Sequence, residues 1–153
     1  MSPRRPPQPE KIRHVFRIED WTFDYSYSVG LLRPDEYTDS QHLKIEGSII
    51  EPAKITAKRG TITCFPMAGL VGVDRSHVTS TLEKPASVGA VYYRGKSYQA
   101  HLFFPADALP LILQMLLAGK YRHVTFDAWK SGNEVFNFTF TDCDRRTNDE
   151  ALP

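Results

Sequence analysis

The residue types that carry most metal and covalent chemistry are scattered along this chain. Each of its 5 histidines falls on a different expected element, and none lies within metal-ligand spacing of another histidine or of a cysteine. Cys64 falls inside an expected strand, where it is expected as a small buried apolar residue. Cys143 follows the last expected strand, with Arg145 and Arg146 as the only basic neighbours that would activate its thiol. We therefore predict no metal site, no bound cofactor and no catalytic cysteine.

The motifs of common hydrolases and phosphate-binding proteins are also missing. No Gly-x-Ser-x-Gly pattern is present, and the glycines at Gly69 and Gly72 are not followed by the Lys and Ser or Thr of a phosphate loop. Glu19 and Asp20 are adjacent on an expected strand, so their carboxylates point to opposite faces and cannot act as a pair. The sequence thus favours binding over catalysis. An enzyme whose active site is assembled from distant strands is the second alternative.

The stretch from Pro66 to Pro85 is long and largely irregular, and irregular segments of this length in compact domains usually carry function. Apolar side chains stand beside charged and polar ones within it, which suits an interaction surface. We predict contact with a protein partner or a second copy of the chain. The alternative is that Leu70 and Val71 fold back over an open end of the sheet. The candidate contact residues in this stretch are Met67, Leu70, Val71, Arg75 and His77.

A leucine-rich segment near residues 106–118 has apolar residues at helical spacings of three and four. Pro110 lacks an amide hydrogen, which costs least in a first helical turn, and Gly119 suits the position just after the last turn. Because this helix is apolar around most of its circumference, we expect it between the sheet and a second surface. Its outer residues Leu113 and Leu117 are further candidates for a protein interface.

Aromatic and basic residues interleave on the hairpin expected around Arg94, Gly95 and Lys96. Such a surface can stack bases and follow phosphates, so nucleic-acid binding is the first alternative function. The arginines near the N-terminus support it, whereas tyrosines facing each other across a hairpin also stabilise sheets without any ligand. The residues of this alternative site are Tyr92, Tyr93, Arg94, Lys96 and Tyr98.

The dominant period along the chain is two, which is the spacing of a strand with one buried face. Odd positions from Trp21 to Val29 are apolar and predict a half-buried strand, and the apolar register changes near Glu19 and Asp20, as at a bulge or between two strands. Further strands are expected at 43–49, 55–58, 61–65, 88–93, 97–104, 123–129 and 135–141, with a tight hairpin between 55–58 and 61–65. We predict an all-β or β-rich α+β fold, an antiparallel β-sandwich or open barrel of about eight or nine strands with one α-helix near residues 106–118.

Length and composition fit one domain. The chain has 153 residues, of which 41% are hydrophobic and 24% charged, with a formal net charge of +1 that excludes a basic footprint over the whole protein. We expect a disordered proline- and arginine-rich arm at 1–10, a single domain at 11–143 and a flexible polar tail at 144–153. No apolar run approaches the roughly 18 residues of a membrane span, and two cysteines suit a reducing compartment, so a cytoplasmic protein without membrane contact is expected.

Charge is distributed unevenly along the chain. Residues 18–51 hold eight acidic and two basic side chains, whereas residues 52–104 hold seven basic and two acidic ones. Our interpretation is that acidic and basic strands lie side by side and screen one another.

Overall fold

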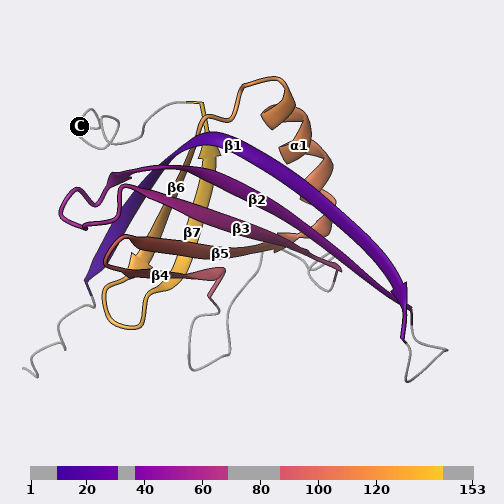
Figure 1. Cartoon of the computed structure of the whole chain (residues 1–153), viewed down its shortest axis with the longest axis horizontal. Helices are drawn as coiled ribbons and strands as arrows, with labels where there is room; N and C mark the ends of the chain where they lie inside the picture. The colour runs from indigo at the N-terminus through magenta and orange to yellow at the C-terminus, as the bar shows by residue number, and fades with distance from the viewer. Residues whose placement is uncertain (1–9, 31–36, 69–86, 143–153) are drawn as a thin grey trace, which may run out of the picture.

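A computed structural model describes residues 10–30, 37–68 and 87–142. These residues are mostly strands with one short helix, which confirms the predicted β-rich fold (Figure 1). The elements in chain order are β1 (Lys11–Val29), β2 (Tyr37–Glu51), β3 (Arg59–Met67), β4 (Gly89–Arg94), β5 (Ser97–Pro105), the short 3-10 helix η2 (Ala106–Ala108), α1 (Leu109–Leu117), β6 (His123–Trp129) and β7 (Glu134–Thr141). The expected arm and tail, apart from Glu10, lie outside the described residues.

The strands close into a barrel in the order β1-β2-β3-β5-β4-β7-β6, with β6 pairing back to β1. Of the two predicted alternatives, a sandwich or an open barrel, the structure has a barrel, and it is closed where an open one was expected. Neighbours are antiparallel except β3 and β5, which run parallel from Thr61 beside Gln99 to Met67 beside Pro105. β5 lies between β3 and β4. It pairs in parallel with β3 along one edge and antiparallel with its hairpin partner β4 along the other.

Seven strands are described instead of the expected eight or nine, for two local reasons. β1 is continuous through the predicted register change, where its pairing with β2 shifts between Ile18 and Asp20, as at a bulge. Residues 55–58 form no strand: a turn and a bend occupy residues 53–56, and the Lys58 ammonium donates to the carbonyls of Ala53 and Ile55. Gly60 is the second residue of β3 and does not make the expected hairpin.

Inward side chains of all seven described strands fill the barrel, so it has a packed core. Glycines allow the closest approaches: a Cβ on Gly47 would overlap the Arg17 carbonyl oxygen, and one on Gly60 would press on the Tyr98 ring. Cys64 is fully buried as expected, and burial raises the pKa of its thiol to about 12. The fully buried apolar residues include Phe16, Leu43, Ile45, Ile62, Val91, Leu102, Val124 and Phe126.

The predicted helix is present, and its buried residues join the barrel core. Leu109, Ile112 and Leu116 are buried, and α1 ends as predicted before Gly119, which has the positive φ of 68° that favours glycine. The α-helix begins later than expected because residues 106–108 form the 3-10 turn η2. Within the described chain, no helix has the length and apolar character needed to cross a membrane.

The hairpin formed by β1 and β2 reaches beyond the barrel (Figure 1). β6 pairs with β1 only along residues 11–17, and β3 pairs with β2 only along residues 43–48. Residues 24–29 and 37–42 therefore pair only with each other among the described strands, as a two-stranded ribbon with two open edges. We call these two segments the arm from here on. They are distinct from the expected N-terminal arm at residues 1–10.

Candidate functional site

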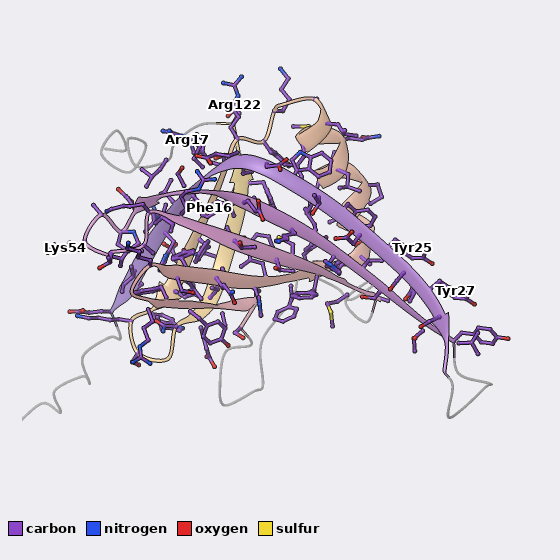
Figure 2. All side chains as sticks on the ribbon, in the orientation of Figure 1. Phe16, Arg17, Tyr25, Tyr27, Lys54 and Arg122 are labelled. Carbon is purple, nitrogen blue, oxygen red and sulfur yellow. The ribbon has the colours of Figure 1, made fainter. Side chains whose placement is uncertain are left out.

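One face of the arm is aromatic and open to solvent. Tyr25, Tyr27 and Tyr37 are 58%, 61% and 64% exposed, and Val29 is 46% exposed. The Tyr27 and Tyr37 rings stack with centroids 6.0 Å apart. Figure 2 shows Tyr25 and Tyr27 at the far end of the molecule from Lys54. The predicted half-burial of this strand is correct for Trp21 and Phe23, which pack against the core, and wrong for Tyr25, Tyr27 and Val29.

The opposite face of the arm is polar, so the ribbon is amphipathic. The Ser28 and Thr38 hydroxyls lie 3.0 Å apart across the two strands, and His42 Nε2 lies 3.4 Å from the Asp24 carboxylate. Serine and threonine occupy most of the remaining positions on this face. On the tyrosine face, no described part of the chain packs over the rings.

The arm and its base carry more acidic than basic side chains. Asp20, Asp24 and Asp39 lie on this hairpin, and all three are exposed. At the base, Lys44 pairs with Glu46 at 3.2 Å, so this lysine offsets an acidic neighbour. The exposed aromatic face is thus set in a negative surrounding.

The opposite end of the barrel carries exposed basic side chains, and we call it the basic end. The turn between β4 and β5 carries Arg94 and Lys96, both exposed, and Lys54 lies at the same end of the molecule (Figure 2). Arg59 opens β3 at this end and is paired with Glu19.

Two hollows flank the turn between β4 and β5. The first measures about 300 Å³ and is lined by Tyr92, Tyr93, Arg94, Ser97, Gln99 and Asn133. The second, of about 320 Å³, is lined by Glu46, Arg59, Gly60, Thr61, Lys96, Ser97, Tyr98 and Gln99. Each is large enough for an aromatic ring, because a cavity of about 150 Å³ holds a benzene molecule.

The structure separates the residues proposed for nucleic-acid binding. Tyr92, Arg94 and Lys96 are exposed, whereas Tyr98 is only 3% exposed and its hydroxyl lies 2.8 Å from His14 Nδ1. Tyr93 is half-buried and its ring stacks on Tyr98 with centroids 6.0 Å apart. Burial raises the pKa of Tyr98 well above its ordinary value, so this tyrosine belongs to the core.

An outward aromatic row crosses neighbouring strands. The Phe65 ring lies 5.6 Å from both His101 and Phe103, and Tyr92 lies 6.1 Å from His101. His42 joins the row at 6.5 Å from Phe65. These residues alternate with buried ones along their strands, so strand periodicity alone places them on an outer face, but only the sheet order brings them together.

The residues proposed for protein contact have different environments. Met67 and Leu117 are 41% and 75% exposed, and Leu113 packs partly against the core. Leu111, which was not among the predicted contact residues, is 58% exposed. Leu70, Val71, Arg75 and His77 lie outside the described residues. Two of the three described contact candidates are thus exposed, and the third is half-buried.

Of the histidines that the structure describes, His14 is the buried one, at 1% exposed. Its ring stacks on Phe126 with centroids 4.7 Å apart, and burial lowers its pKa to about 4 despite the nearby Asp127 carboxylate. His14 is thus neutral at physiological pH. Outside the barrel wall, Arg13 donates to Asp127 at 3.0 Å, and this hydrogen bond raises the pKa of Arg13. Among the described residues, no cluster of three potential metal ligands occurs.

Comparison of the chain with protein-family models, curated proteins and solved structures gives no match.

Proposed function

We propose that this protein is a non-catalytic binding module that recognises another protein chain through the tyrosine face of its arm. The observation that supports this function most strongly is the set of three tyrosines, each about three-fifths exposed, on one face of a ribbon that extends beyond the barrel.

The free arm is poorly stabilised. A two-stranded ribbon is marginally stable in water, and its open edges present unpaired backbone groups that can pair with another chain. Tyrosine with serine is also the composition of antibody binding loops, because tyrosine offers a large contact area with few rotatable bonds. A binding partner that covers the face and pairs with an edge would stabilise the arm.

The exposed area sets the expected strength of binding. An aromatic side chain buries roughly 150–250 Å² when fully covered, so three tyrosines at these exposures offer roughly 350 Å². A standard interface buries about 800 Å² on each partner. Polar groups of the arm and its strand edges must therefore supply the rest, and we expect an affinity near the micromolar range.

A photo-crosslinking experiment tests this function. The photoreactive amino acid p-benzoylphenylalanine replaces Tyr27 in one variant and Ser26, on the opposite face, in a matched control. We expect ultraviolet light in the native host to link position 27 to one or a few proteins, and position 26 to them far less. Equal labelling from both positions, or no protein adduct from position 27, would contradict the proposal.

A second candidate function is single-stranded nucleic-acid binding on the outer aromatic row. The rings of Tyr92, His101 and Phe65 follow one another across three strands, with Arg94 and Lys96 at the adjacent turn. Titration with oligonucleotides would then show binding that weakens with added salt and with Arg94→Ala. Absence of binding at low salt would exclude this candidate.

A further inference from the structure

We infer that the partner of the arm is a second copy of this chain, and that the arm of one copy docks on the basic end of the barrel of the next. This inference rests on the proposed function and names its partner. It joins two surfaces of the same molecule that are complementary in charge and in shape.

The arm and the β4–β5 turn carry opposite charges. The arm carries exposed Asp24 and Asp39, whereas the β4–β5 turn carries exposed Arg94 and Lys96. Neither Arg94 nor Lys96 forms an ion pair with an acidic residue in the described part of the chain. Opposite charges on two patches direct their encounter and disfavour competing arrangements. An arm-to-arm pairing would instead bring the aspartates of two copies together.

A hollow beside the β4–β5 turn is large enough for a side chain of the arm. The hollow of about 300 Å³ beside this turn is bordered by Tyr92, Tyr93 and Arg94. It has room for a tyrosine ring, by the comparison with benzene given above. Tyr92 offers an aromatic edge or face for stacking, and Arg94 offers a guanidinium to place over the incoming ring. Tyr27, near the end of the arm, is the ring that we assign to this hollow.

Within one molecule the two surfaces lie far apart. The arm and the β4–β5 turn lie at opposite ends of its long axis (Figure 1). Figure 2 likewise places Tyr27 and Lys54 at opposite ends. An arm therefore cannot reach the basic end of its own barrel, and docking must join two copies through different surfaces. Such head-to-tail contacts build closed rings or open chains.

The experiment uses the full chain with one variant for each surface. Tyr27→Ser removes the arm's ring, and Arg94→Glu with Lys96→Glu reverses the charge of the basic end. Sedimentation velocity at low salt is expected to show that the wild-type mass grows with concentration, while each variant alone associates at least tenfold more weakly. Ser26→Ala, on the polar face of the arm, is the control that should associate like the wild type. Circular dichroism confirms that each variant folds.

Mixing the two variants is the decisive step. The Tyr27→Ser protein keeps an intact basic end and the charge-reversed protein keeps an intact arm, so the mixture should form a 1:1 dimer that grows no further. If the wild type associates but the mixture does not, the contact is not head-to-tail and the inference is wrong. A wild type that stays monomeric at high micromolar concentration also overturns it.

The failures of the two proposals are distinguishable. A monomeric wild type together with an adduct from position 27 to a different protein would refute the second copy as partner and retain the proposed function. A monomeric wild type with no protein adduct from position 27 would refute both. Salt-sensitive binding of RNA to Arg94 and Lys96 in a monomeric protein would assign the basic end to nucleic acid instead.

Discussion

Replacing His14 and Tyr98 together by phenylalanine should make the stability of the barrel less dependent on pH. His14 is buried and neutral, because burial lowers its pKa from 6.5 to about 4. In the unfolded chain the imidazole takes up a proton near pH 6.5, while in the folded chain it stays neutral until about pH 4. The unfolded state therefore gains protons first as the pH falls. Stability is complete above pH 6.5 and is lost as the pH approaches 4.

The shift gives the size of the effect. A pKa difference of one unit corresponds to about 1.4 kcal/mol, so the full loss below pH 4 is about 3 kcal/mol. Between about pH 7.5 and about pH 5 the free energy of unfolding should fall by about 2 kcal/mol from His14 alone. The pairing with Tyr98 explains why both residues are changed. His14→Phe alone would leave the Tyr98 hydroxyl buried without its partner, at a cost of about 1–3 kcal/mol at every pH.

Urea unfolding followed by tryptophan fluorescence measures this difference at several pH values. Carboxylates elsewhere contribute equally to the wild type and the double variant, so the difference between the two pH profiles isolates His14. We expect the double variant to lose about 2 kcal/mol less than the wild type between about pH 7.5 and about pH 5. Parallel profiles would refute the assignment of His14 as a buried neutral base.

Two further predictions concern the packing of the barrel. Gly47→Ala should destabilise the protein by more than about 3 kcal/mol or prevent folding, because the new Cβ overlaps the Arg17 carbonyl oxygen of the paired strand. Urea unfolding measures this loss of stability. An unfolding midpoint equal to that of the wild type would contradict the prediction. Leu116→Ala should lower the free energy of unfolding by about 2–5 kcal/mol, because Leu116 is only 6% exposed. Leu117 is 75% exposed, so Leu117→Ala should change it by no more than about 0.5 kcal/mol. Equal urea midpoints for these two variants would show that α1 does not pack on the barrel through Leu116.

Local elements could be predicted because their periodicities are clear. The hairpin around Gly95 followed from two alternating runs with a glycine between them, and Gly95 has the positive φ of 58° that this turn needs. The helix followed from leucines at spacings of three and four. Its first turn was misplaced, since the sequence does not distinguish a 3-10 turn at Ala106–Ala108 from a full α-helical turn.

The pairing of strands was less predictable than the strands themselves. The parallel contact between β3 and β5 depends on where the chain returns after residue 68, a long-range choice that alternation does not encode. The bulge in β1 was one of two stated alternatives, because a change of apolar register alone does not decide between one strand and two.

The candidate site was missed because alternation shows which side chains share a face and not whether that face is covered. Tyr25 and Tyr27 continue the same row as the packed Trp21 and Phe23, although they lie beyond the barrel. The length of the row, which exceeds the usual strand of about five or six residues, was the available signal. The opposite error concerned Tyr98, which the register of the β4–β5 hairpin places on the other face from Tyr92.

Hydrogen exchange of the arm amides tests the central claim most directly. A free two-stranded ribbon opens easily, so the amides of residues 24–29 and 37–42 should exchange rapidly in dilute protein. If the arm docks on a second copy, their deuterium uptake should slow as the protein concentration rises, and Tyr27→Ser should abolish this change. Uptake by the wild-type arm that stays the same at every concentration would contradict the account.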